Sequence, residues 1–370
     1  MTHLLPLVTA HEREHTYCSF CPKLCRVACP VSTAQGSETT TPWGKMTNLH
    51  HLAKGQLPLD EAHAASLYAC TGCQRCKSYC DHDTEVAAAL NAGRAEAVRA
   101  RVAPAAAYSI IERHQARQEH AASAAERIFG QDKLARSDAP VVFFPGCTAC
   151  AVRPDDALAG EEAVRRLAGV PTRVEASGCC GLPLLEAGDR DGFLSAATRM
   201  LARFEGAQEV VFEDPGCLYA LSAIAKRMGL ESDVRMSHLS QLADRHIARL
   251  EPIPDLPDGP VRYHDPCKLG RGLGVYEEPR RVLRKALGRQ LSEFHHHGER
   301  AECSGGGGQL PRTDRATSDA IAQERLRTHE REGGGLLVSA CAASARRFEA
   351  QPDAPQVASF ASLLVRAIRD

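Results

Sequence analysis

The chain carries almost no net charge, because 45 lysines and arginines are offset by 46 aspartates and glutamates. This balance gives no indication of binding to nucleic acid or to an anionic membrane surface. No uninterrupted apolar run approaches the roughly 20 residues that a helix needs to span a bilayer. We therefore expect a soluble protein, or at most one that lies peripherally on the inner face of a membrane.

A secretory signal and a nucleotide-binding fingerprint are also lacking. The first residues, MTHLLPLVTAHEREH, are too polar and too interrupted for a signal peptide, so we expect a reducing, cytoplasmic setting. The chain has no G-x-G-x-x-G motif and no recognisable flavin site, and the run from Ser304 to Gly308 lacks the order of a phosphate-binding loop. Any two-electron step is therefore expected on another subunit, and we identify no catalytic residue.

Cysteine, in contrast, is abundant, with 16 in 370 residues. Clustered thiols in a reducing compartment indicate metal or redox chemistry. Composition divides the chain into a cysteine-rich domain at 1–100, an Ala- and Arg-rich helical connector at 101–138, and two further domains at 139–255 and 256–370. The boundary between the last two is the proline-rich loop EPIPDLPDGP at 251–260.

Two cysteine runs stand near the N-terminus, CSFCPKLCRVACP and CTGCQRCKSYC. Such spacing wraps three thiolates around one iron–sulfur cube and sends the fourth to a neighbouring cube. One [4Fe-4S] cluster is then expected on Cys18, Cys21, Cys25 and Cys80, and a second on Cys29, Cys70, Cys73 and Cys76. A pair of zinc knuckles is the alternative, but tetrahedral zinc gives no reason for the third cysteine in each run.

The 40 residues between the two runs are compatible with helices and carry a turn at TTTPWGK. The whole pattern resembles the α-helical ferredoxin domains of the iron–sulfur subunits of glycolate oxidase and of anaerobic glycerol-3-phosphate dehydrogenase. In that resemblance, Thr41 to Lys45 correspond to a turn with a proline, a glycine and a basic residue.

A ladder of cysteines occurs twice in the remaining chain. The first copy has Cys147, the pair Cys179-Cys180, and Cys217, and the second has Cys267, Cys303-Ser304 and Cys341. The offsets of 120, 124 and 124 residues indicate an internal duplication. Strand-like runs alternate with helical segments through both copies, which predicts α/β domains with short parallel sheets. We therefore predict an α+β multidomain fold.

Each cysteine of the first ladder follows a strand-like run, and Cys217 is expected just before a helix. Because the carboxyl ends of parallel strands meet in one crevice, thiols that are far apart in sequence can come together there. Four thiolates suffice for a [4Fe-4S] cluster in the first copy. Cys150 has Gly270 as its counterpart in the second copy and is expected to bind no metal.

The duplicated ladder resembles the CCG-domain family, which includes a subunit of heterodisulfide reductase and lactate-utilisation protein A. In the heterodisulfide reductase form, each ladder ends in C-x-x-C and five cysteines hold a noncubane cluster. Here Ala220 and Ser344 occupy those terminal positions. The resemblance therefore favours an electron-transfer member over one that cleaves a disulfide.

The second copy offers three thiols, because Ser304 stands where the first copy has Cys180. A cluster with one open iron, a zinc site and an empty copy remain alternatives. His264, three residues before Cys267, is a further candidate ligand or a structural residue. The run His295 to His297 is expected to be solvated.

The resemblance implies an iron–sulfur subunit that takes electrons from a flavoprotein dehydrogenase oxidising a 2-hydroxy acid or glycerol 3-phosphate. A quinone or another carrier is the expected acceptor. The alternative is a disulfide reductase that acts at a CCG-domain cluster. A third class, a redox- or iron-sensing protein, would need a basic recognition surface, which the balanced charge does not indicate.

Overall fold

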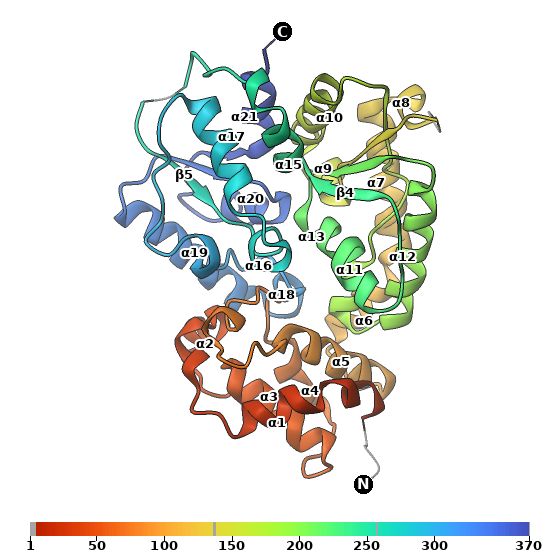
Figure 1. The fold of residues 1–370 in the computed structure, drawn as a ribbon. Helices are drawn as coiled ribbons and strands as arrows, with labels where there is room; N and C mark the ends of the chain where they lie inside the picture. The colour runs from red at the N-terminus through yellow and green to blue at the C-terminus, as the bar shows by residue number, and fades with distance from the viewer. Residues whose placement is uncertain (1–4, 136–137, 257, 370) are drawn as a thin grey trace. The chain divides into compact units, whose positions relative to one another are not determined.

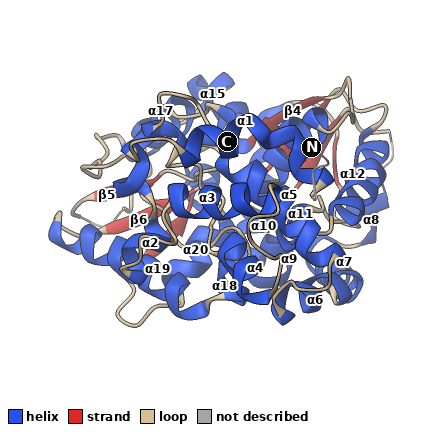
Figure 2. Ribbon diagram, turned by 90° about the horizontal axis from the view of Figure 1, so that it is seen from below, coloured by secondary structure: helices blue, strands red, loops and turns tan. Residues whose placement is uncertain are grey.

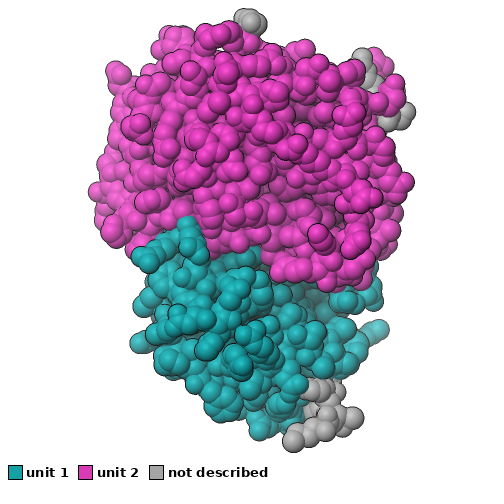
Figure 3. Space-filling model, viewed as in Figure 1, with its two compact units in different colours: residues 1–114, 183–193, 299–325 teal, residues 115–182, 194–298, 326–370 magenta. Residues whose placement is uncertain are grey.

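The computed structural model describes residues 5–135, 138–256 and 258–369 of the chain. The chain forms two compact units, which Figure 3 shows in different colours. The first unit consists of residues 1–114, 183–193 and 299–325, and the second of residues 115–182, 194–298 and 326–370. Helices outnumber the few short strands in the described residues (Figure 2). No helix in this part of the chain is both long and apolar enough to cross a membrane.

The first unit is helical throughout its described residues (Figure 1). Its helices pack around one core that includes Met46, Leu49, Leu67 and Leu90. The helices of residues 5–114 are η1 (Pro6–His11), α1 (Glu12–Ser19), η2 (Leu24–Ala28), α2 (Pro30–Gln35), α3 (Pro42–Ala53), α4 (Glu61–Tyr68), η3 (Lys77–Tyr79), α5 (Val86–Arg99) and α6 (Ala105–Glu112). Helix α18 (Leu310–Thr313) comes from the far end of the sequence.

Helix α3 begins earlier than the sequence predicts. Thr41 caps it by accepting a hydrogen bond from the Gly44 amide at 3.1 Å, and Pro42 occupies its first turn. Proline suits that position because its missing N–H would have no partner within the helix. The turn predicted at residues 39–45 is confirmed for residues 39–41, but residues 42–45 form the first turn of a helix, which turns Lys45 into the interior.

The second unit contains two parallel sheets. The first has the order β2-β1-β3-β4, from β1 (Val141–Phe144), β2 (Thr172–Val174), β3 (Glu209–Phe212) and β4 (Arg235–His238). All four residues of β1 are buried, as expected for a parallel strand that is covered on both faces. Its helices include α7 (His114–Phe129), α8 (Gln131–Ala135), α9 (Cys147–Val152), α10 (Pro154–Ala168), α13 (Pro215–Leu218), the π-helix η4 (Tyr219–Ile224), α14 (Ala225–Arg227), α15 (Leu239–Arg245) and η5 (Ile247–Arg249).

The second sheet repeats this arrangement with one strand fewer in the described residues. Its order is β5-β6-β7, from β5 (Val261–His264), β6 (Leu336–Ser339) and β7 (Val357–Ser359). In place of β2, the described residues of this copy show one hydrogen bond from Ser292 N to Val261 O at 2.9 Å. The accompanying helices are α16 (Gly270–Leu273), α17 (Glu277–Leu287), α20 (Ala342–Glu349) and α21 (Phe360–Ala367).

The two copies in the second unit share one hydrophobic core. Phe143 and Leu239 of the first copy belong to the same buried cluster as Tyr263, Leu283 and Phe360 of the second. Residues of both units occur in α11 (Leu182–Ala187), α12 (Arg190–Phe204) and α19 (Arg315–Arg331), and also in α7, which begins at His114, and η6 (Gly298–Arg300). The predicted fold class, a helical domain followed by two α/β copies with small parallel sheets, is confirmed.

Candidate metal centres

The first group of thiols, site A, comprises Cys18, Cys21, Cys25 and Cys80. All four line one cavity in the first unit, together with Tyr17, Lys23, Trp43, His82 and Thr84. Cys18 lies in the last turn of helix α1, Cys25 lies in η2, and Cys80 directly follows η3. Burial, together with the neighbouring thiols, raises the pKa of Cys18 to about 12 and that of Cys25 to about 11. Iron would replace these protons and favour the thiolates.

The second group, site B, comprises Cys29, Cys70, Cys73 and Cys76, which line a neighbouring cavity. Burial raises the pKa of Cys76 well above its usual value, and the thiols of Cys73, Cys70 and Cys29 add to this effect. Cys76 lines the cavities of both sites. The fold thus brings Cys80 to the first run and Cys29 to the second, the exchange that the spacing predicts.

A buried lysine provides a test of whether site B fits an iron–sulfur cluster. Lys45 is 1% exposed, and its ammonium donates to Ala69 O at 2.6 Å and to Cys29 Sγ at 3.4 Å. Burial alone would lower its pKa, but the thiols of Cys29, Cys70 and Cys76 outweigh that effect and raise it. A buried ammonium costs several kcal/mol unless negative charge lies beside it. Four thiolates around a cluster would supply that charge, so the donor set fits the group.

A second buried cation fixes the same cysteine loop. Arg94 is 2% exposed and donates to the carbonyl oxygens of Leu67 at 2.9 Å, Cys70 at 3.1 Å and Glu186 at 2.8 Å. It also donates to Gly308 O at 3.4 Å. Sequence reasoning missed Arg94, because an arginine in a helix rich in alanine and charge usually faces solvent.

The glycine run that follows Cys303 packs against site B. A Cβ atom on Gly307 would lie 2.4 Å from Thr71 O, and one on Gly308 would lie 2.0 Å from Cys70 O. Only glycine permits this approach of two backbones. The run thus serves as a backbone contact with the loop that carries Cys70.

Four thiols of the first ladder converge in the second unit. Cys147 contacts Cys179, Cys179 contacts Cys180, and Cys180 contacts Cys217, in an unbroken chain of side-chain hydrogen bonds. The bond with Cys180 lowers the pKa of Cys217, but burial and Asp214 outweigh it and raise the pKa to about 12. We call this group the first-ladder site.

Helix α13 holds Cys217 in its first turn. Asp214 caps this helix by accepting hydrogen bonds from the amides of Gly216 at 2.8 Å and Cys217 at 3.1 Å, and Pro215 occupies the first turn. The expectation that Cys217 precedes the helix is therefore wrong, because the aspartate and the proline start the helix two residues earlier.

The second ladder is divided between the two units. Cys303 and Ser304 belong to the first, and Cys267 and Cys341 to the second. Cys303 nevertheless repeats the turn of Cys179: Gly305 N donates to Cys303 Sγ at 3.3 Å, as Gly181 N donates to Cys179 Sγ at 3.4 Å. Burial raises the pKa of Cys341 to about 12, and Asp214 and Cys267 add to the effect.

The remaining candidates lie as follows. The His264 ring is 2% exposed and packs edge-on against Phe348, with ring centroids 4.9 Å apart. Ser344 contacts Cys341, and Ala220 is fully buried.

Two further candidates lie apart from the ladders. Cys150 is 3% exposed within the core of the second unit. The Nδ1 atom of His297 lies 2.7 Å from the carbonyl oxygen of Phe294. Across the described residues, no three His, Cys, Asp or Glu side chains meet closely enough to hold a single metal ion.

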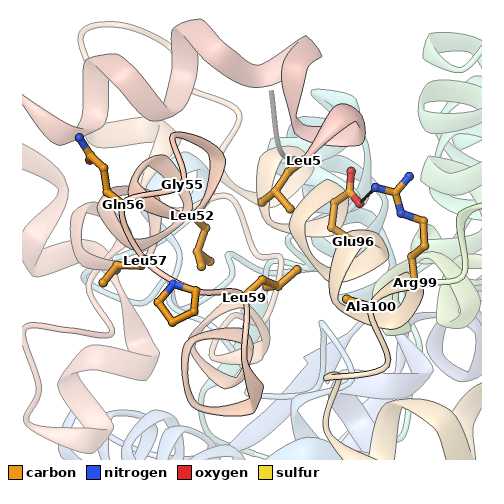
Figure 4. Close-up of a pocket in the computed structure, with 10 residues that line it drawn as sticks. Leu5, Leu52, Gly55, Gln56, Leu57, Leu59, Glu96, Arg99 and Ala100 are labelled. Atoms are coloured by element: carbon orange, nitrogen blue, oxygen red, sulfur yellow. Dashed lines mark ion pairs between the residues drawn. The ribbon is translucent and has the colours of Figure 1, made fainter. Parts of the chain in front are cut away.

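Another cavity in the first unit, of about 530 Å³, is lined without cysteine (Figure 4). Leu5, Leu52 and Leu59 line it, and Glu96 and Arg99 form an ion pair of 2.6 Å on one side. The Glu96 carboxylate also accepts a hydrogen bond from Leu7 N at 2.6 Å. Because these polar groups satisfy one another, we assign no ligand to this cavity.

Comparison with known families matches three stretches of the chain. Residues 14–84 match the 4Fe-4S dicluster domain family, and residues 141–222 and 261–343 each match the cysteine-rich domain family called CCG. The chain therefore belongs to the CCG-domain iron–sulfur oxidoreductases, with an N-terminal dicluster domain for two [4Fe-4S] clusters.

Three relatives show the range of this family. The chain is 26% identical over 299 residues to a subunit of the fumarate reductase (CoM/CoB) of Methanothermobacter marburgensis, covering 77% of this chain and 58% of that protein. It is 27% identical over 294 residues to a subunit of the dihydromethanophenazine:CoB–CoM heterodisulfide reductase of Methanosarcina barkeri, covering 74% and 70%. It is 32% identical over 168 residues to the EtfAB:quinone oxidoreductase of Syntrophomonas wolfei, covering 43% and 23%.

Proposed function

We propose that this protein is the electron-transfer subunit of an oxidoreductase complex, with clusters at site A, at site B and at the first-ladder site. The observation that carries the proposal is the convergence of three separate sets of four thiols from cysteines that are far apart in sequence. An iron–sulfur cluster accepts and donates single electrons, over potentials that its surroundings set. A chain with several such sites conducts electrons between partners.

The protein residues hold and tune these groups. Site A would use Cys18, Cys21, Cys25 and Cys80, site B would use Cys29, Cys70, Cys73 and Cys76, and the first-ladder site would use Cys147, Cys179, Cys180 and Cys217. Lys45 and Arg94 place two buried positive charges beside the cysteine loop of site B. Cys267, Cys303 and Cys341 remain candidate ligands of a second-copy site.

The donor and the acceptor belong to other subunits. The sequence has no dinucleotide-binding fingerprint, and the relatives include proteins that are named as subunits and as a quinone oxidoreductase. We propose a flavoprotein dehydrogenase for a 2-hydroxy acid or glycerol 3-phosphate as the donor and a quinone or another carrier as the acceptor. The complex would work in the cytoplasm, free or on the inner face of the membrane.

The test is anaerobic purification with iron, sulfide and zinc measured per chain. We expect about twelve irons with equal sulfide, about four for each of the three sites. About eight irons would remove the first-ladder site from the proposal. Zinc in place of iron and sulfide would contradict electron transfer altogether.

A disulfide reductase is the second candidate, and the likeness to the heterodisulfide reductase of Methanosarcina barkeri favours it. Against it, Ala220 and Ser344 stand where the disulfide-cleaving form of the ladder has cysteines. The isolated chain with dithionite and a mixed disulfide substrate distinguishes the two. We expect no thiol release, and catalytic release would establish the second candidate.

A further inference from the structure

Exposed apolar side chains gather around the first cysteine run. Tyr17 is 46% exposed, Phe20 82%, Leu24 54% and Val27 72%. The other large exposed apolar side chains of the described residues, Val152, Leu158 and Val170, all belong to the second unit. We call Tyr17, Phe20, Leu24 and Val27 the site A patch. All four lie within eleven residues of the chain, and this concentration of exposed apolar side chains is typical of an interaction site.

The site A patch lies next to the thiols of site A. Its four residues alternate along the chain with Cys18, Cys21 and Cys25, and Tyr17 lines the site A cavity itself. Cys21 and Cys25 are partly exposed. None of the patch residues lines the cavity of site B. A protein bound on the patch would therefore cover site A and exclude water from it.

Two cations beside the patch are held on aromatic rings. The Arg13 guanidinium lies 5.0 Å from the centre of the Tyr17 ring, and the Lys23 ammonium lies 3.8 Å from the centre of the Trp43 ring. Within the described residues, neither side chain forms an ion pair with a carboxylate. Cations that are held on aromatic faces in this way complement an acidic surface on a partner.

We propose that a flavoprotein subunit with an apolar, acid-rimmed docking face binds the site A patch and passes its electrons into site A. This inference rests on the proposed function and names the place where its donor binds. Each step oxidises the partner's reduced flavin by one electron and reduces the iron–sulfur group at site A by one. Two steps reoxidise a two-electron-reduced flavin, whose protons pass to solvent.

A protein partner fits this surface better than a lipid bilayer does. Helix α1, which carries Tyr17, has two acidic residues, Glu12 and Glu14, in its first turn and no basic residue in its last turn. Helices that lie on membranes are rich in lysine and arginine on their polar face. Redox complexes, in contrast, often use small interfaces with an apolar centre and a charged rim.

The experiment compares two double variants of the full chain, loaded with its clusters. Phe20→Ser with Val27→Ser changes the patch, and Leu158→Ser with Val170→Ser removes two exposed apolar side chains of the second unit as a control. The probe is the flavoprotein that copurifies with the tagged wild-type chain, reduced and mixed anaerobically in a stopped-flow instrument. Dithionite reduction and iron content report on the sites without any partner.

We expect the patch variant to be reduced by the flavoprotein about tenfold more slowly or worse, as when an interface loses its central aromatic residue. Dithionite reduction and iron content stay unchanged, and the control variant behaves as wild type.

A pair of charge reversals tests the cations beside the patch. Arg13→Glu slows reduction by the flavoprotein at low salt, whereas Arg165→Glu on α10 does not. Equal rates for the patch variant and wild type would overturn the docking site and leave the proposed function standing.

Two other outcomes also decide the matter. If no flavoprotein binds the wild-type chain, the proposed function and the docking site both fall. If the chain binds vesicles of phosphatidylglycerol and phosphatidylcholine, and the patch variant loses only that binding, the patch is a membrane contact and the docking proposal is overturned.

Discussion

At the scale of single residues, the interior holds charged groups whose role depends on what lies beside them. Lys45 and Arg94 are both buried against the cysteine loop of site B, where they contact carbonyl oxygens and a thiol. A buried positive charge stabilises an added electron nearby. Lys45 would therefore raise the potential of a cluster held at site B without being a ligand.

Replacing Lys45 isolates that effect. We expect Lys45→Met to lower the midpoint potential of one [4Fe-4S] cluster by about 60 mV or more, a tenfold change for a one-electron couple. Lys45→Arg keeps the charge and should stay near the wild-type value. Redox titration followed by electron paramagnetic resonance measures both. If the midpoint potentials of both N-terminal clusters were unchanged in Lys45→Met, the ammonium would influence neither cluster.

Glu213 is a buried acid that the sequence did not mark. Burial, with Asp156 and Asp214 nearby, raises the pKa of Glu213 well above its usual value, and its Oε2 has no hydrogen-bond partner among the described residues. The pKa of Glu213 is thus higher in the folded protein than in the unfolded chain. The stability that this group contributes is fully present below its pKa in the unfolded chain, and it is lost as the pH rises through its pKa in the folded protein.

Glu213→Gln removes this loss. We expect the variant to gain about 1 kcal/mol or more in unfolding free energy over wild type as pH rises from about 5 to about 8. Chemical denaturation at the two pH values measures the difference, and Glu205→Gln, at an exposed position, is the control. An equal gain at both pH values would mean that folding does not raise the pKa of Glu213.

At the scale of elements, loops and helix starts position the thiols. Cys179 and Cys303 have the same turn, because Gly181 and Gly305 adopt φ values of 79° and 81° and each donates its amide to the cysteine sulfur. Asp214 and Pro215 start the helix that holds Cys217. The duplicated ladder thus repeats backbone geometry as well as spacing.

Gly308 tests the contact between the glycine run and the Cys70 loop. Gly308→Ala would place a Cβ 2.0 Å from Cys70 O, and we expect a loss of about 2–4 kcal/mol in stability together with a lower iron content. Gly298→Ala is the matched control: its φ of 58° is close to the 64° of Gly308, but open space surrounds it. Thermal unfolding and iron analysis compare the two. If Gly308→Ala and Gly298→Ala lowered stability and iron content equally, the strain of a side chain at positive φ would explain both results, and the contact with Cys70 O would not be needed.

At the scale of the whole molecule, iron content reports which thiols act together. We expect Ser304→Cys to raise the iron per chain, because Cys303 already has the turn geometry of Cys179 and Ser304 stands at the position of Cys180 in the ladder. Cys150→Ser should leave iron unchanged, whereas Cys217→Ser should remove about four irons. Unchanged iron in Ser304→Cys would identify the second copy as an empty remnant.

Much of the fold was accessible from the sequence, because the signals are local or repeated. Alternating strands and helices predicted β1, β2, β3, β5 and β6, and the offset between the ladders predicted two copies. Strands β4 and β7 were missed, as was the lack of a β2 counterpart among the described residues of the second copy. Short strands such as β4, with its exposed Arg235, carry too little apolar pattern to be recognised.

The sequence by itself determined which residues carry the chemistry, because cysteine spacing is a covalent property of the chain. Tertiary structure alone decided what surrounds them: Lys45 turned inward, the glycine run against Cys70, and Phe20 and Val27 left exposed. Burial and contact depend on packing between segments that are far apart in sequence. No local pattern records that packing.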